Sequence, residues 1–153
     1  PASRERNIIT SLDLDAYRQE QFNLKLQRKY KEIEEKEVRF EKIACDDADY
    51  LLVAYGSSSR ICQKAIEIAR EKGIKVGLLR PITLFPYPTK AIQAMLGQVK
   101  GILAVEMSAG QMVEDVRLAV EGKVKVQHYG RMGGVIPTPN EVVKALEEQI
   151  IKG

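Results

Sequence analysis

Residues 50–56, YLLVAYG, form a continuous apolar run that ends at a glycine. Such runs are typical of strands that are buried on both faces of a sheet, because neither face meets water. Residues 58–72 follow with apolar side chains at helical spacing, and Gly73 stands where a helix commonly ends. The sequence therefore predicts a buried strand that leads directly into an amphipathic helix.

The same strand-and-helix pattern continues to the end of the chain. Three further strands are predicted at residues 74–79, 101–107 and 123–129. The helices predicted after them occupy residues 89–99, 110–120 and 138–151. Strands that alternate with helices of this length need crossover connections, so we expect a mainly parallel sheet with helices on both faces.

The last helix carries explicit signals for its first turn. Thr138 stands at the N-cap position, Pro139 at the first helical position, and Glu141 three residues after the cap. Thr and Glu at this spacing predict a capping box, in which each side chain bonds to the other residue's backbone N–H.

The N-terminal part of the chain differs in character. Residues 11–37 are rich in charge and contain neither glycine nor proline. One helical face carries the apolar residues Phe22, Leu26, Tyr30 and Ile33. This pattern predicts a long helix, either a solvated coiled-coil-like surface helix or a connector that packs on another domain or subunit. Residues 38–44 then alternate as a half-buried strand does, so we divide the chain into a helical connector (1–37) and an α/β domain (38–153).

Composition limits the class of protein. The 153 residues suffice for one domain with a real core, and the net charge of +3 argues against a strongly basic nucleic-acid binder. No apolar stretch approaches the roughly 20 residues that span a bilayer, and the polar start, PASRERN, lacks a signal peptide's apolar region. We expect a cytoplasmic protein that binds neither nucleic acid nor membrane. Because the first residue is Pro1 rather than Met, we expect a piece of a longer protein.

Few residues could hold a metal. Cys45 and Cys62 stand apart in sequence, and His128 is the only histidine. A zinc site usually needs four ligands and an iron–sulfur cluster four thiolates, so Cys and His alone cannot build either. We interpret both cysteines as small buried apolar residues.

Ligands and partners of open α/β sheets lie outside the carboxyl ends of the strands, so the loops there are the candidate sites. After the YLLVAYG strand come Gly56, Ser57, Ser58, Ser59 and Arg60. These residues fit either a serine-capped helix or a helix start that binds an anion. They match neither the dinucleotide-binding glycine motif nor the P-loop motif.

The loop after the next strand is rich in proline and aromatic residues. Its candidate interface residues are Arg80, Pro81, Phe85, Pro86 and Tyr87. Proline removes backbone donors and fixes φ, so regular structure is excluded. The loop is too apolar for a free linker, and it packs either on its own domain or on a neighbour.

The two remaining loops carry isolated polar residues. The first offers Glu106, Ser108, Gly110 and Gln111, and the second offers Arg131, Gly133 and Gly134. A lone glutamate is weak support for acid–base chemistry. Arg131 binds an anion or braces its loop, and bracing is the favoured interpretation. No Ser–His–Asp set and no acidic cluster for Mg²⁺ accompany them, so we expect no catalytic residues.

Four segments together resemble a known family. They are DADYLLVAYGSSSR (47–60), KGIKVGLLRPITLFPYP (72–88), ILAVEMSAGQMVEDVRLAV (102–120) and YGRMGGVIPTPNEV (129–142). The chain resembles the C-terminal, transketolase-like domain of the alpha subunit of 2-oxoacid:ferredoxin oxidoreductases, in the 2-ketoisovalerate and 2-oxoglutarate branch. This resemblance implies a three-layer α/β/α fold whose five strands run in the order 1-3-2-4-5, with the first strand antiparallel. That order places a switch point between the loops at residues 56–59 and 106–110.

The resemblance also implies a function for the whole complex. Such enzymes oxidatively decarboxylate a 2-oxoacid on thiamine diphosphate, reduce ferredoxin through iron–sulfur clusters, and release an acyl-coenzyme A. The cofactors lie outside this fragment, which is expected to bind none, to have no activity alone, and to assemble with a beta subunit and a ferredoxin-like subunit in an oligomer. Two alternatives stay open: a regulatory domain that contacts a nucleotide or coenzyme A, and the C-terminal domain of a 2-oxoacid dehydrogenase E1 chain or a transketolase.

Overall fold

The computed structural model describes residues 11–153, so the first ten residues of the predicted connector lie outside the described part. The chain divides into two units, of which residues 37–153 form the larger. Within the smaller unit, helix α1 (Ala16–Lys36) forms as the charge-rich, glycine-free sequence predicts. Asp15 caps its start, because its carboxylate accepts the Arg18 N–H at 3.1 Å. None of the side chains of α1 is buried.

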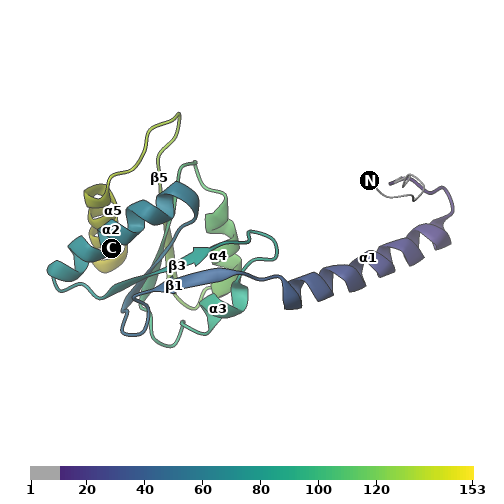
Figure 1. Cartoon of the computed structure of the whole chain (residues 1–153), viewed down its shortest axis with the longest axis horizontal. Coiled ribbons are helices and arrows are strands. Elements are labelled where there is room, and N and C mark those ends of the chain that lie inside the picture. Colours follow the sequence, from purple (N-terminus) through teal and green to yellow (C-terminus); the bar gives the residue numbers. More distant parts are fainter. Residues whose placement is uncertain (1–10) are drawn as a thin grey trace, which may run out of the picture. The chain divides into compact units, whose positions relative to one another are not determined.

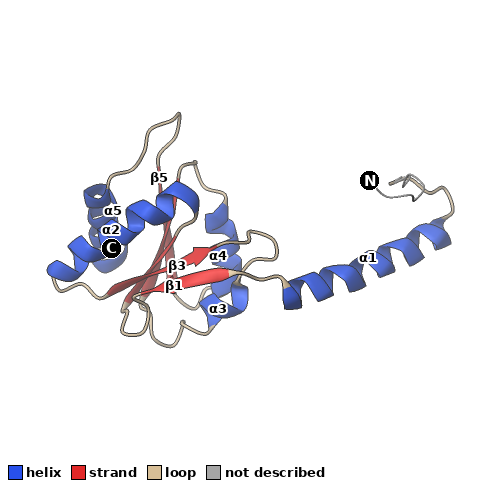
Figure 2. Ribbon diagram, in the orientation of Figure 1, coloured by secondary structure: helices blue, strands red, loops and turns tan. Residues whose placement is uncertain are grey.

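The larger unit is built on a five-stranded sheet in the order β1-β3-β2-β4-β5 (Figures 1 and 2). The strands are β1 (Phe40–Ile43), β2 (Tyr50–Val53), β3 (Val76–Pro81), β4 (Gly101–Glu106) and β5 (Lys125–Gly130). The edge strand β1 runs antiparallel to β3, and the other pairs are parallel. Both the strand order and the antiparallel first strand confirm the predicted topology.

Helices cover both faces of the sheet, which confirms the three-layer architecture. One face carries α2 (Gly56–Glu71) and α5 (Pro139–Leu146), and a π-helical turn at Glu147–Ile151 continues α5. The other face carries α3 (Thr89–Gln93) and α4 (Met112–Val120). The predicted capping box of α5 is present, with Thr138 and Glu141 bonding to each other's backbone N–H.

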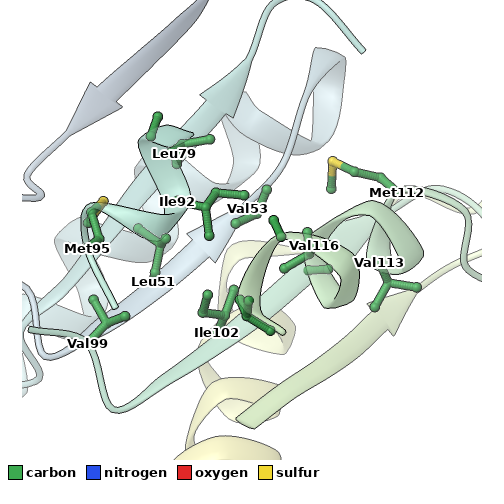
Figure 3. Close-up of a cluster of buried hydrophobic side chains, with 14 of the residues drawn as sticks. Leu51, Val53, Leu79, Ile92, Met95, Val99, Ile102, Met112, Val113 and Val116 are labelled. Carbon is green, nitrogen blue, oxygen red and sulfur yellow. The ribbon is translucent and has the colours of Figure 1, made fainter. Parts of the chain in front are cut away.

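The apolar runs of the sequence become two cores, one on each face. Successive side chains of a strand point to opposite faces, so Leu51 and Val53 join the α3–α4 core, while Leu52 joins the α2–α5 core. Figure 3 shows the first of these cores, with Ile102 of β4 facing Val116 of α4. Both strands lie in the middle of the sheet, where β4 is fully buried and β2 is buried except at Tyr50, so both are apolar on both sides.

The predicted helix at residues 89–99 is shorter than expected. It ends at Gln93, and the next residues form turns in which Met95 N bonds to Ile92 O and Leu96 N to Gln93 O. The Gln98 amide then donates to the Cys45 and Ala48 carbonyls, each at 2.9 Å. These two hydrogen bonds hold Gln98 against the connection between β1 and β2, so the chain leaves the helical conformation that its periodicity predicts. In the described part of the chain, no helix is both long and apolar enough to cross a bilayer.

Candidate functional site

The carboxyl ends of the four parallel strands meet at one edge of the sheet. The chain passes from β2 through α2 to β3 on one side, and from β3 back across β2 to β4 on the other. The connections therefore diverge between β2 and β4, which are hydrogen-bonded neighbours. Every residue that the sequence nominated lies in the last residues of these strands, in the loops after them or at the start of α2, and we call this edge of the sheet the loop edge.

The start of α2 opens on this edge. Gly56 is its first residue and has a φ of +57°, a left-handed conformation that favours glycine. The Ser59 hydroxyl donates back to the Gly56 carbonyl at 2.7 Å, so it does not serve as an N-cap. Ser58 and Ser59 are buried, whereas Ser57 and Arg60 are exposed. Tyr55, at the N-cap position, offers no side-chain bond to this helix end.

Glu106 closes the start of α4. It is only 2% exposed, and its Oε2 accepts hydrogen bonds from the Ser108 hydroxyl at 3.2 Å, Gln111 N at 3.1 Å and Met112 N at 2.9 Å. Its Oε1 accepts from Val113 N at 3.0 Å. A carboxylate bound to the free N–H groups of a helix start stabilises that helix electrostatically. Glu106 therefore has a structural role as the cap of α4, and it occupies the position that an anion would take there.

The geometry around Glu106 is set by the neighbouring strand. The side chain of Glu106 lies on the α4 face of β4, because it alternates with Ile102 and Ala104. His128 of β5 places its Nε2 3.7 Å from Glu106 Oε1. A Cβ on Gly130 would lie 2.2 Å from the Ser108 carbonyl oxygen and 2.5 Å from His128 Cε1, so this position excludes any larger residue.

The loop after β3 is partly buried and partly exposed. Pro81 and Pro86 are buried, and the bond between Phe85 and Pro86 is cis. The Tyr87 ring packs against the α3–α4 core, while Phe85 is 63% exposed. Burial raises the pKa of the Tyr87 hydroxyl well above its usual range, and the negative charges of Asp115 and then Glu106 add to this effect. The proline-rich loop thus packs on its own domain through Tyr87 and presents Phe85 outward.

Two of the three nominated arginines of the loop edge, Arg80 and Arg131, form ion pairs within the chain. Arg80 Nη1 bonds to Glu41 Oε2 at 2.9 Å, and Arg131 Nη1 bonds to Glu141 Oε1 at 2.7 Å. Arg131 therefore braces the start of α5, as the favoured interpretation expected. Gly133 and Gly134 follow in an exposed turn, and both have positive φ values, of 64° and 84°.

The loop edge combines two features that are unusual on a domain surface. Its exposed large apolar side chains are Ile82, Leu84, Phe85, Met107, Met132, Val135 and Ile136. Within residues 11–153, the buried side-chain polar atoms that lack a partner are Arg80 Nε, Tyr87 Oη and His128 Nε2. All three belong to the last residues of β3 or β5 or to the loop after β3. An orphaned buried polar atom usually has a bound water or another molecule as its partner.

Metal-ligating groups do not gather anywhere in the described residues. No three side chains of His, Cys, Asp or Glu lie close enough there to hold an ion. Both cysteines are buried and free, and burial raises the pKa of the Cys62 thiol to about 12. A thiol in this state is a poor metal ligand and a poor nucleophile. The described residues therefore do not fit an iron–sulfur cluster.

The structure joins some of the nominated residues and separates others. Glu106, Ser108, Gly110 and Gln111 form one hydrogen-bonded loop, in which Gly110 N also donates to the Ser108 hydroxyl at 3.2 Å. The serines of α2 form no bond with this loop. Sequence reasoning gave no role to His128, although its place two residues before Gly130 on the same strand face puts it beside Glu106. Whether these loops form an interface stays a prediction.

Known relatives decide the family. Residues 48–142 match the sequence model of pyruvate:ferredoxin oxidoreductase core domain II. Over 143 residues, 94% of the chain, it is 47% identical to the ketoisovalerate oxidoreductase subunit VorB of Methanothermobacter thermautotrophicus. The chain belongs to the 2-oxoacid:ferredoxin oxidoreductases. The resemblance carried by the four sequence segments is thus confirmed. The domain spans 40% of the length of that VorB chain.

Other relatives and two solved structures agree with this family and fold. The domain is 32% identical over 101 residues to the 2-oxoglutarate synthase subunit KorA of Methanothermobacter marburgensis, which covers 66% of this chain and 27% of KorA. A 2-oxoglutarate:ferredoxin oxidoreductase from Magnetococcus marinus, solved with 2-oxoglutarate, coenzyme A and succinyl-CoA, matches 90% of this chain and 24% of its own with a TM-score of 0.76. A split-gene transketolase, an inactive beta4 tetramer, matches 74% of this chain and 41% of its own with a TM-score of 0.63. At 23% and 15% identity, these two structures show the fold alone.

Proposed function

We propose that this chain is a non-catalytic assembly domain of a cytoplasmic, thiamine-diphosphate-dependent 2-oxoacid:ferredoxin oxidoreductase. The whole enzyme converts a 2-oxoacid to an acyl-coenzyme A and passes the electrons to ferredoxin. The loop edge docks on a beta subunit or a ferredoxin-like subunit of the same complex. Family membership supports the reaction, and the chemistry of the loop edge supports the docking role.

One observation carries the docking role. The loop edge exposes apolar side chains from three separate loops, such as Phe85, Met107 and Ile136. Contiguous exposed apolar surface is rare on monomers and marks interaction sites. Exposed apolar anchors of this kind are what a protein interface needs at its centre.

The non-catalytic role follows from what the loop edge does with its polar residues. Glu106 accepts hydrogen bonds from the start of α4, Arg80 pairs with Glu41, and Arg131 pairs with Glu141. These three charged groups are thus held by the fold, whereas Arg60 at the start of α2 is exposed. Thiamine diphosphate, the iron–sulfur clusters and coenzyme A are accordingly assigned to other parts of the complex.

An activity assay tests the non-catalytic role. The chain is incubated with a branched-chain 2-oxoacid or 2-oxoglutarate, thiamine diphosphate, coenzyme A and ferredoxin, and ferredoxin reduction is followed by absorbance. We expect no reduction by the chain alone. Reduction that requires the 2-oxoacid and persists through repeated purification of the chain would overturn the proposal.

A second function, contact with coenzyme A, is favoured by one feature. The start of α2 has no side-chain cap and lies beside the exposed Ser57, whereas Glu106 fills the corresponding position of α4. Backbone N–H groups left free in this way attract phosphates. Equilibrium dialysis of coenzyme A against the chain tests this function, with Ser57→Asp as the variant that places a carboxylate at the same helix end. Binding that the variant abolishes would support this function, and no binding by the unaltered chain would exclude it.

A further inference from the structure

The four methionines of the chain lie in two contrasting environments. Met95 and Met112 belong to the α3–α4 core, where they are 4% and 3% exposed (Figure 3). Met107 and Met132 lie on the loop edge and are 42% and 58% exposed. An oxidant reaches a sulfur atom through the solvent, so exposure separates two reactive methionines from two protected ones.

The other side chains that peroxides oxidise are protected or absent. The chain contains no tryptophan, and its two cysteines, Cys45 and Cys62, are buried. Burial raises the pKa of both thiols, so both are protonated at neutral pH and unreactive. Within residues 11–153, hydrogen peroxide therefore meets two exposed methionine sulfurs, and both belong to the loop edge.

The two exposed methionines lie in loops that begin side by side. Met107 directly follows β4, and Met132 comes two residues after β5. These strands are hydrogen-bonded neighbours, and Glu106 is opposite Gly130 at their ends. Arg131 N then donates to the Glu106 carbonyl at 3.3 Å, which holds the starts of the two loops together. Oxidation of both methionines would therefore alter one part of the loop edge.

Oxidation changes the polarity of these two side chains. The thioether sulfur attacks one oxygen of hydrogen peroxide, an S–O bond forms as the O–O bond breaks, and water leaves. The sulfur loses two electrons, which the peroxide takes up. The thioether is apolar and adaptable, whereas the sulfoxide that forms is polar. A polar group that is buried in an interface without a hydrogen-bond partner weakens that interface.

We propose that Met107 and Met132 are sites at which hydrogen peroxide oxidises this chain and thereby prevents docking at the loop edge. This inference rests on the proposed docking role. Docking covers the loop edge, so the oxidation acts on the unassembled chain and blocks its assembly. The change is reversible, because reductases exist for each of the two epimers of methionine sulfoxide.

Peptide mapping by tandem mass spectrometry tests the two sites in the chain alone. The folded chain is exposed to dilute hydrogen peroxide, catalase stops the reaction at a series of times, and the sulfoxide at each methionine is quantified. We expect Met107 and Met132 to be oxidised at least about tenfold faster than Met95 and Met112. The oxidised chain should keep its free energy of unfolding, because both sites are exposed. Similar rates at all four methionines, or a loss of stability, would overturn the assignment.

A pull-down with treated and untreated chain tests the effect on docking. The chain is freed of peroxide before it meets lysate from its source, and the lysate is dialysed to remove the reductants that repair sulfoxides. We expect the treated chain to retain about fivefold less of the beta subunit and the ferredoxin-like subunit than the untreated chain. Incubation of the treated chain with both methionine sulfoxide reductases should restore retention.

Met107→Leu with Met132→Leu is the matched variant, because leucine is apolar and has no sulfur. Its retention is measured as the ratio of treated to untreated chain, so that any effect of leucine itself on docking cancels. We expect this ratio to stay near one. A ratio that falls as far as that of the unaltered chain would show that Met107 and Met132 are not the responsible sites.

The outcomes separate the effect of oxidation from the docking role. Equal retention of the two subunits by the treated and untreated chains would refute the effect of oxidation and leave the docking role standing. No retention of either subunit by the untreated chain would refute the docking role and, with it, the control of docking by oxidation.

Discussion

At the scale of single residues, the loop edge is shaped by groups that bond within the chain. Glu106 serves the backbone of α4, and Arg131 serves Glu141. The sequence alone could predict that Glu106 stands at a strand end, but not that its acceptors would be saturated, because the donors are backbone N–H groups whose positions depend on the turn at residues 108–111. The role of Arg131 was predictable because a glutamate stands in the first turn of the helix that follows its loop.

Glu106→Gln tests the capping role of this carboxylate. The substitution keeps the shape but removes the charge and turns one acceptor into a donor that faces backbone N–H groups. We expect the free energy of unfolding to fall by roughly 2–3 kcal/mol, measured by chemical denaturation. The matched control is Glu114→Gln, an exposed acid in the same first turn, for which we expect a change below about 0.5 kcal/mol. Similar losses for the two variants would contradict the cap.

Tyr87→Phe tests the buried hydroxyl. The pKa of Tyr87 is raised in the folded chain, mainly by burial, while an unfolded tyrosine ionises near about 10. The stabilising contribution of Tyr87 is therefore fully present below about pH 10 and is lost as the pH rises further, because only the unfolded chain then releases the proton. We expect the variant to lose this alkaline decline in the free energy of unfolding.

At neutral pH the same variant removes a hydroxyl without a partner. We expect its unfolding free energy to stay the same or to rise by up to about 1 kcal/mol. A loss of more than about 1 kcal/mol would show that the hydroxyl has a stabilising partner in the isolated chain. Urea unfolding at a series of pH values measures both effects.

At the scale of elements, strands and helix starts were more predictable than helix ends. The strands β2 and β4 can be recognised in the sequence because both are central in the sheet and therefore apolar throughout. The start of α5 can be recognised because its capping residues lie close together in the sequence. The end of α3 depends instead on distant contacts. Gln98 bonds to the Cys45 and Ala48 carbonyls, and Lys100 N bonds to the Asp49 carbonyl at 2.7 Å. Helical periodicity in a sequence carries no information about such hydrogen bonds between distant segments.

Thr138→Ala measures the strength of the capping box of α5. The Thr138 hydroxyl accepts the Glu141 N–H at 3.3 Å, and alanine has no acceptor for it. We expect the substitution to lower the free energy of unfolding by roughly 1 kcal/mol, measured by chemical denaturation. Asn140→Ala alters an exposed residue of the same turn and serves as the control. A Thr138→Ala chain as stable as the control would show that the box contributes nothing.

At the scale of the whole molecule, periodicity predicted a layered, mainly parallel α/β domain, but it could not give the strand order. The order 1-3-2-4-5 came from the resemblance to a family, and the structure confirms it. Because β2, β3, β4 and β5 run parallel, the loops after them leave the sheet at one edge. Phe85 and Ile136 lie in two of these loops, and the proposed docking role treats them as parts of one surface.

The most direct test uses the chain as bait and a matched pair of variants. Phe85→Ser with Ile136→Ser alters two exposed residues of the loop edge. Leu118→Ser alters a residue that is 77% exposed near the end of α4, away from the loop edge. Each folded bait is incubated with lysate from its source, and the retained proteins are identified and quantified by mass spectrometry.

We expect the unaltered chain and the Leu118→Ser chain to retain a thiamine-diphosphate-binding beta subunit and a ferredoxin-like subunit. We expect the double variant to retain at least about tenfold less of both, because exposed anchors at the centre of an interface carry much of its affinity. Equal retention by the double variant and the control, or no retention of these subunits by the unaltered chain, would contradict the docking role of the loop edge.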